Sequence, residues 1–288
     1  MTSPPEGVVV AFKPKGITSH DVVDGVRRLL GTKKVGHAGT LDPMATGVLV
    51  LGVGRATRLL RYLSGLDKEY EGTAVLGVET DTLDAEGQVL RTAPVEVSRD
   101  RVEEAMRALT GEIEQVPPAF SAVKVGGQKL YKAARRGEVV EAPPRTVRVE
   151  RFELTRFEPP EVDLRVVCSS GTYIRVLVAD VGRALGCGAH LSRLIRTRVG
   201  PFGLDRAVMV NRIKKPLPLE TAVAHLPSFA LEHPDEARAA GNGSCLAPAA
   251  IEGPYALFGP DKRFIGIWRD TGAKSCPEMV LAPVPDAG

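Results

Sequence analysis

Cysteine is scarce in this sequence, and its spacing excludes two kinds of site. The 288-residue chain contains four cysteines, and no two of them form the C-x-x-C pair typical of zinc and redox motifs. The spacing therefore favours reduced, structural thiols over a zinc centre or a dense disulfide framework. The cysteines are Cys168, Cys187, Cys245 and Cys276.

Long apolar runs and a strong charge bias are also missing. No stretch is apolar over a membrane-spanning length, and the first residues lack the apolar run of an export signal. We therefore expect a cytoplasmic protein with no membrane partner. Lys and Arg total 38 against 35 Asp and Glu, a balance too even to indicate a polyanionic partner by itself. Hydrophobic residues at 43% of the chain are typical of a folded globular protein.

The basic residues are concentrated in two places. One is the segment from Lys124 to Arg151, where they outnumber the acids, and the other is the run Arg193, Arg196 and Arg198. Charge alone would fit solvated faces of helices and strands equally well. The local concentration nevertheless makes nucleic acid a partner worth testing.

Periodicity predicts an α+β core followed by a smaller β-rich domain. Short β-branched runs predict strands within residues 7–14, 48–54 and 70–78, and helical spacing predicts helices that begin near Thr18, Ser98 and Tyr173. The stretch KKPLPL at residues 214–219 is typical of a linker. We therefore expect one domain over residues 1–215 and a second over residues 216–288.

The glycine-rich loop GHAGTLDP, residues 36–43, holds an imidazole, a hydroxyl and a carboxylate. Pro43 restricts the backbone of Asp42, so the carboxylate is presented from a stiff segment. A turn aspartate bonded to its own backbone would be the ordinary interpretation of this pattern. A phosphate cradle is disfavoured, because the loop lacks the G-K-[ST] ending and carries an acid where an anion would bind.

Motifs over roughly residues 8–210 resemble one family closely. In family order they are FKPKGITSHDVV, KKVGHAGTLDPMATGVLVLGVGRATR, KEYEG, PPAFSAVKVGGQKLYKAARRGE, SSGTYIRVLVADVGRALG and AHLSRLIRTRVGPF. The family is the bacterial tRNA pseudouridine synthases of the TruB type, which modify uridine 55 in the T loop. GHAGTLDP is highly specific for this family, and SGTYIR is specific in combination. Met44 and Val50 depart from the family pattern at positions that carry no chemistry.

The resemblance implies a fold and a reaction. The fold would be a pseudouridine-synthase-type core, with a mixed or antiparallel sheet and flanking helices, plus a PUA-like RNA-binding domain at the C-terminus. A segment at about residues 121–140 would close over the RNA. The reaction breaks the C1′–N1 glycosidic bond of uridine, turns the uracil and rejoins it through C5. It requires no cofactor or metal, and we expect a monomer that acts on the T arm of tRNA.

The resemblance also implies roles for three catalytic residues. Asp42 would be the catalytic carboxylate, which can stabilise or trap positive charge at C1′ or take the C2′ proton. Arg175 would pair with it and keep it ionised. Tyr70 would stack on the flipped uracil, with its hydroxyl near the reacting edge. An isolated Arg would more often be a surface residue, and a strand Tyr a packing residue.

The remaining implied residues bind substrate. Tyr173 and Leu194 would line the pocket, although both types commonly pack in a core, and His37 would fill space or contact phosphate. Phosphate contacts are expected from Lys13, Lys15, Lys124, Lys129 and Lys132. Two other functions stay open: a non-catalytic tRNA-binding protein or folding chaperone, and a uridine isomerase acting on ribosomal RNA.

Overall fold

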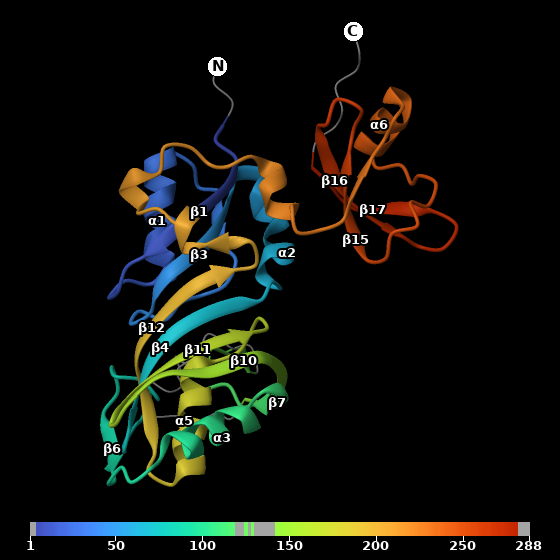
Figure 1. Cartoon of the computed structure of the whole chain (residues 1–288). Coiled ribbons are helices and arrows are strands. Elements are labelled where there is room, and N and C mark those ends of the chain that lie inside the picture. Colours follow the sequence, from blue (N-terminus) through green and yellow to red (C-terminus); the bar gives the residue numbers. More distant parts are fainter. Residues whose placement is uncertain (1–3, 119–123, 126–127, 130–141, 282–288) are drawn as a thin grey trace.

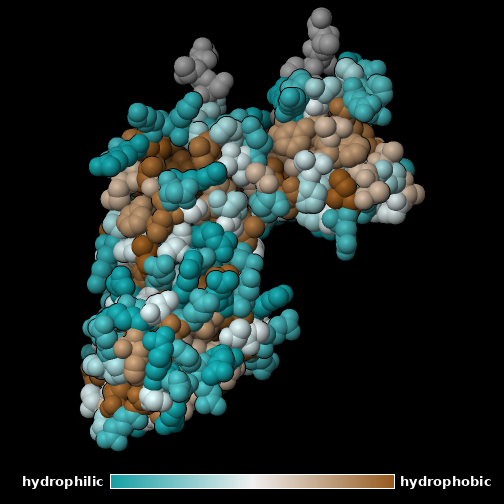
Figure 2. Space-filling model, in the orientation of Figure 1, coloured by the Kyte–Doolittle hydropathy of each residue, from teal (hydrophilic) through white to brown (hydrophobic). Residues whose placement is uncertain are grey.

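The structure is a computed structural model that describes residues 4–118, 124–125, 128–129 and 142–281. Most of the expected RNA-closing segment, including Lys132, lies outside these residues. In Figure 1 a long twisted sheet carries helices along its length, and the C-terminal domain stands beside one end of it. Between that domain and the other end of the sheet, the molecule is hollowed (Figure 2).

One nine-stranded sheet forms the first domain. Its main strand order is β1-β3-β12-β4-β11-β10-β7, with β2 beside β3 and β13 beside β12. Every pair is antiparallel except β3 with β12, so the predicted mixed sheet is confirmed. The strands are β1 (Gly7–Lys13), β2 (Val35–His37), β3 (Thr46–Val53), β4 (Lys68–Leu76), β7 (Gly111–Gln115), β10 (Arg145–Glu158), β11 (Glu161–Cys168), β12 (Ala189–Val199) and β13 (Phe202–Gly203).

Two of the helices begin at the capping residues that the sequence predicts. Thr18 accepts a hydrogen bond from the Asp21 backbone at the start of the first helix, Gly31 ends it with φ +61°, and Ser98 caps the helix that begins at Arg99. Among the described residues the α-helices are α1 (Ser19–Leu30), α2 (Leu60–Ser64), α3 (Arg99–Ala108), α5 (Ile174–Leu185) and α6 (Pro234–Gly241). The short 3₁₀ helices are η1 (Gly54–Leu59), η2 (Leu204–Arg206), η3 (Val210–Arg212) and η4 (Leu219–Val223).

Strands β1 and β3 are buried on both faces, which explains their uninterrupted apolar runs. Val9 and Leu49 belong to the cluster formed with α1, whereas Val8 and Val48 belong to a cluster that includes α2 and η4. That second cluster continues into the C-terminal domain through Ile267. At the other end of the sheet, α3 and α5 cover β4, β10 and β11.

The C-terminal domain is a four-stranded sheet in the order β14-β15-β16-β17, with α6 against it. The strands are β14 (Ser228–Ala230), β15 (Pro254–Phe258), β16 (Phe264–Asp270) and β17 (Ser275–Val280). Polar contacts also join this sheet to the first domain: the Tyr62 hydroxyl donates to Glu278 at 2.7 Å, and Arg58 donates to the carbonyl oxygen of Val280 at 2.9 Å. Two further hairpins complete the described strands, β5 (Val78–Thr80) with β6 (Val89–Thr92), and β8 (Lys124–Val125) with β9 (Gln128–Lys129).

Two expectations need correction or refinement. Cys245 and Cys276 form a disulfide, so the expectation of reduced thiols is wrong for this pair, which only the fold brings together. The expected linker is not a free tether, because Leu217 pairs with Val8 on β1. The boundary at residue 215 stays a prediction. Among the described residues, no helix is long and apolar enough to span a membrane.

Candidate active site

A cleft of about 250 Å³ opens where the Asp42 loop meets β4, β12 and the start of α5. It brings together the predicted residues Asp42, Tyr70, Tyr173, Arg175 and Leu194, which come from four separate parts of the chain. Its other lining residues are Gly39, Thr40, Leu41, Met44, Ser64, Lys68, Asp84, Ser170, Gly171, Thr172, Ile174, Leu191 and Arg196.

Arg175 lies between two carboxylates at the base of the cleft. Its guanidinium is 3.5 Å from Asp42 and 3.2 Å from Asp84. The Arg175 and Asp84 side chains are 6% and 5% exposed, whereas that of Asp42 is 41% exposed. Asp42 is therefore the one of the three that a molecule in the cleft can reach, with the ion pair behind it.

Asp84 is a site residue that the sequence did not reveal. It lies in the loop between β5 and β6, where TDTLDAEG is typical of a turn. One Asp84 oxygen accepts from the Thr82 hydroxyl at 2.6 Å and from the Glu86 backbone at 3.0 Å, and the other accepts from Arg175. These bonds fix the Asp84 carboxylate, so it orients the Arg175 guanidinium toward Asp42.

Burial raises the pKa of the Asp42 carboxyl above its ordinary value. The Arg175 charge lowers this pKa, as expected from the sequence, but the charge of Asp84 raises it. The net direction is upward, so Asp42 takes up a proton at a higher pH than a free aspartate. The predicted ion pair is present, and Arg175 opposes the effect of burial without cancelling it.

Buried side chains hold the backbone of the Asp42 loop from several directions. Arg196, 1% exposed, donates to the carbonyl oxygens of Gly39 and Thr40 at 3.2 and 3.3 Å. The Ser19 hydroxyl accepts from the Leu41 backbone at 2.8 Å and donates to its carbonyl oxygen at 3.1 Å. The loop is thus fixed immediately before Asp42, as a reacting group requires.

Lys13 holds the loop on the far side of Asp42. It is fully buried, and its ammonium donates to the carbonyl oxygens of Pro43 and Ala45 at 3.2 and 2.6 Å. Burial lowers the pKa of Lys13 to about 8. The predicted phosphate contact is therefore wrong for Lys13, because its donors are turned inward and RNA has no access to them. Lys15, by contrast, is exposed.

Tyr70 faces the cleft from β4, directly opposite Arg196 on β12. Burial raises the pKa of its hydroxyl, so the phenol stays protonated at neutral pH. Lys68, two residues earlier on the same face, donates to the carbonyl oxygens of Ser64 and Leu66 at 2.6 and 2.5 Å. Arg196 and Lys68 were both missed as site residues, because a basic residue in a strand is ordinarily a surface residue.

The other predicted residues occupy different positions. Tyr173 precedes α5, and its backbone N–H donates to the Gln115 side chain at 2.9 Å. The guanidinium of Arg145 lies 5.2 Å from the Tyr173 ring centre, at cation–π distance. His37 lies on β2 outside the cleft lining, and burial lowers its pKa. Lys124 and Lys129 lie on β8 and β9.

The described residues that line the cleft form no arrangement suited to a metal ion. In the part of the chain that the structure describes, no three His, Cys, Asp or Glu side chains are grouped as ligands. The Asp42 and Asp84 carboxylates are separated by Arg175, whose charge would repel a cation there. The site instead offers one reachable carboxylate, a buried ion pair and an aromatic ring.

Solved structures share this fold. A chain from the crystal structure of a Cbf5–Nop10–Gar1 complex superimposes with a TM-score of 0.74 at 29% identity, over 96% of this chain and 85% of that one. A chain from an H/ACA RNP bound to a substrate RNA containing 2′-deoxyuridine gives a TM-score of 0.73 at 27% identity, with the same coverage. The fold is therefore that of the pseudouridine synthase class.

Sequence comparison defines the family within this class. The TruB family pseudouridylate synthase N-terminal domain matches residues 27–174, and the tRNA pseudouridylate synthase B and tRNA pseudouridine synthase II C-terminal domains match residues 175–224 and 233–282. This chain belongs to the TruB family. It is 49% identical to tRNA pseudouridine synthase B of Mycobacterium sp. (strain KMS), over 96% of both chains, and 48% identical to that of Thermobifida fusca (strain YX), over 96% of this chain and 99% of the relative.

Proposed function

We propose that this protein converts uridine 55 in the T loop of tRNA to pseudouridine, with Asp42 as the catalytic carboxylate. The relatives that match nearly the whole chain are tRNA pseudouridine synthases, and this chain forms pseudouridine in tRNA as they do. The observation that carries the assignment of Asp42 is its position: a half-exposed carboxylate faces the cleft, and the Arg175–Asp84 pair lies behind it.

The chemistry is an isomerisation in which no atom is gained or lost overall. The C1′–N1 bond breaks, the uracil turns, and C5 joins C1′; N1 gains a proton and C5 loses one. An ionised Asp42 can attack C1′ or take the C2′ proton, and both routes need the carboxylate deprotonated and accessible to the sugar. No described main-chain N–H donates to the Asp42 carboxylate, so the turn-aspartate alternative gains no support.

Arg175 and Asp84 act through Asp42. A buried carboxylate drifts toward its neutral form, and the adjacent guanidinium favours the ionised form. Asp84 fixes that guanidinium from the opposite side. A protein that only binds RNA gains nothing from an acid in its cleft, because a carboxylate repels phosphate. This arrangement therefore favours an enzyme over a binding protein or folding chaperone.

Tyr70 supplies a platform for the turned base. Its ring lines the cleft near Leu194, and its protonated hydroxyl can donate to a uracil oxygen. Base and ring can stack once the uridine leaves the helix stack. Tyr173 and Leu194 complete the apolar part of the pocket. Lys15, Lys124, Lys129 and Lys132 add the phosphate contacts that give affinity without sequence preference.

The wider setting belongs to the same proposal. The substrate is the T arm of tRNA, the protein is a monomer, and it acts in the cytoplasm. The C-terminal domain is a PUA-like RNA-binding module, supported by its four-stranded sheet and its fixed contacts with α2. The segment at about residues 121–140 closes over the bound RNA.

The test is tritium release from tRNA labelled at C5 of uridine, with the product site mapped. Release equal to one equivalent per tRNA, from position 55 alone, is the expected result. Release from another position of tRNA, or from ribosomal RNA in preference to tRNA, would contradict the T-loop assignment. No release from any substrate would contradict the enzyme assignment itself.

A further inference from the structure

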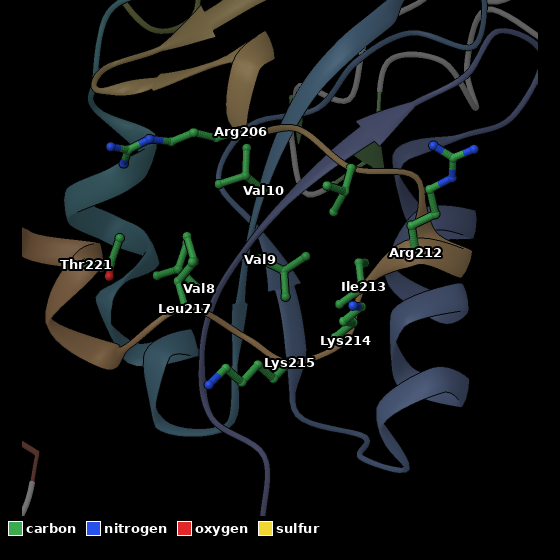
Figure 3. A pocket seen from close by; sticks show the side chains of 11 residues that line it. Val8, Val9, Val10, Arg206, Arg212, Ile213, Lys214, Lys215, Leu217 and Thr221 are labelled. Carbon is green, nitrogen blue, oxygen red and sulfur yellow. The ribbon is translucent and has the colours of Figure 1, made fainter.

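A second and larger cavity, of about 520 Å³, lies on the free side of β1 and shares no lining residue with the active-site cleft. Residues 204–223, here called the strap, frame it together with Val8, Val9 and Val10 (Figure 3). The strap follows the sheet in sequence and precedes the C-terminal domain. The catalytic proposal gives it no role.

The strap is attached to the edge of the sheet at two points. Val208 exchanges backbone hydrogen bonds with Val10 and Phe12 at 3.0 and 2.9 Å, and Leu217 does so with Val8 at 2.7 and 3.0 Å. Between these points the strap leaves β1, and Ile213 is buried in the cluster formed with α1. The cavity is the space left between the strand and the strap. Because the strap is hydrogen-bonded to β1 at both points, this frame is rigid.

Four cations on this frame line the cavity, whereas the two acids of the strap, Asp205 and Glu220, do not line it. Arg206, Arg212, Lys214 and Lys215 all line the cavity, and the sequence from Arg206 to Leu219 contains no Asp or Glu. All four are exposed. Across the described ranges of the chain, no carboxylate forms an ion pair with any of them. This contrasts with Arg55 and Arg61, nearby on η1 and α2, which pair with Glu6 and Glu278.

The directions of these side chains decide which anion they fit. In Figure 3 Arg206 and Arg212 lie on opposite sides of the cavity and extend away from each other, and Lys215 lies below the valines. A single small anion needs donors that converge on one point, whereas these donors are spread around an apolar floor. A spread of unpaired cations suits a chain of phosphates, and the valine floor suits the sugars and bases between them.

We propose that the strap binds the tRNA substrate outside the T arm, with Arg206, Arg212, Lys214 and Lys215 contacting its phosphates. This inference rests on the proposed function, because it takes tRNA as the substrate. Val9 is four residues from Lys13, which holds the catalytic loop, so the cavity lies about 13 Å along β1 from this anchor of the loop. An RNA arm in the cleft leaves the strap free for another part of the same molecule. Since the frame is rigid, little ordering opposes that contact.

The experiment compares full-length tRNA with a T-arm minihelix in a variant with all four cations changed to Gln. For full-length tRNA, the slope of log affinity against log salt should fall in magnitude by about 3, since each lost phosphate contact contributes roughly 0.7–0.9. Affinity near physiological salt should fall at least about tenfold. Minihelix affinity, its salt slope and its single-turnover rate should match the parent.

A matched variant controls for net charge. Arg91, Arg101, Arg107 and Arg183, changed together to Gln, remove the same charge from β6, α3 and α5, at the opposite end of the domain from β1 (Figure 1). This control should leave the slope for full-length tRNA near that of the parent. Thermal unfolding of both variants checks that each is folded.

Three results would overturn the proposal. The strap variant could keep the parent slope for full-length tRNA, which would show that these cations do not contact RNA. It could weaken binding of the minihelix as much as binding of full-length tRNA, or the control variant could reduce the slope as much as the strap variant does. Either result would show that the effect comes from net charge alone. The proposed function is tested separately. It fails if the parent forms no pseudouridine in the minihelix, whatever the salt slopes are.

Discussion

Changing Arg196 to Met removes the buried guanidinium that holds the catalytic loop. Arg196 donates to the carbonyl oxygens of Val48, Gly39 and Thr40 at 2.7, 3.2 and 3.3 Å. Met fills much of the same space but leaves these acceptors without a donor, at about 1–3 kcal/mol each. Removing the guanidinium also relieves its desolvation, so we use the low end of that range. The free energy of unfolding should fall by about 3 kcal/mol.

The effect on rate should exceed the effect on binding. A displacement of about 1 Å in a reacting group can cost on the order of 100-fold in rate. We therefore expect the single-turnover rate of Arg196→Met to fall at least about 100-fold, with tRNA affinity nearly unchanged because Arg196 is buried. Urea unfolding measures the first effect, and rapid mixing of excess enzyme with labelled tRNA measures the second.

Arg198 provides the matched control on the same strand. Its side chain is 38% exposed and pairs with Glu69 at 3.3 Å. Such pairs contribute at most about 1 kcal/mol to stability. The free energy of unfolding of Arg198→Met should therefore fall by no more than this, and its single-turnover rate should match that of the parent. The reasoning is refuted if Arg196→Met unfolds at the parent's urea midpoint and keeps its rate, or if Arg198→Met loses as much rate.

Other predictions test the cleft. Tyr70→Phe should bind a T-arm minihelix well and turn over poorly, and Tyr70→Leu should also weaken binding by about 1–3 kcal/mol; a Tyr70→Phe rate equal to the parent would show that the hydroxyl has no chemical role. Activity needs ionised Asp42. It should therefore fall as the pH drops through the pKa of this carboxyl, which is raised above its ordinary value. Arg175→Met removes a charge that lowers this pKa and should move the acid limb of kcat/KM to higher pH, whereas Asp84→Asn should move it to lower pH; coincident profiles would contradict the three-residue pairing.

The sequence predicted the elements whose signals are local. The cap at Thr18, the stop at Gly31 and the cap at Ser98 mark helix ends through contacts within one turn, and each prediction is confirmed. The apolar runs of β1 and β3 correctly indicated strands, which the structure shows to be buried on both faces. Family resemblance located Asp42 and Arg175, which the structure places 3.5 Å apart.

The parts that the sequence missed depend on contacts between distant segments. Asp84 and Arg175 are separated by 91 residues, and Arg196 is more than 150 residues from the Gly39 carbonyl that it binds. Nothing in the neighbouring residues distinguishes these groups from turn or surface residues. Lys13 shows the converse error, because its basic character suggested phosphate whereas its burial assigns it to the protein's own carbonyl groups.

The most direct test of the central claim is the single-turnover formation of pseudouridine by Asp42→Asn, beside its affinity for tRNA. The amide keeps the shape of the side chain and removes only its ability to ionise. The account predicts no detectable pseudouridine and an affinity close to that of the parent. Pseudouridine formation at a rate near the parent's would show that Asp42 is not the catalytic carboxylate.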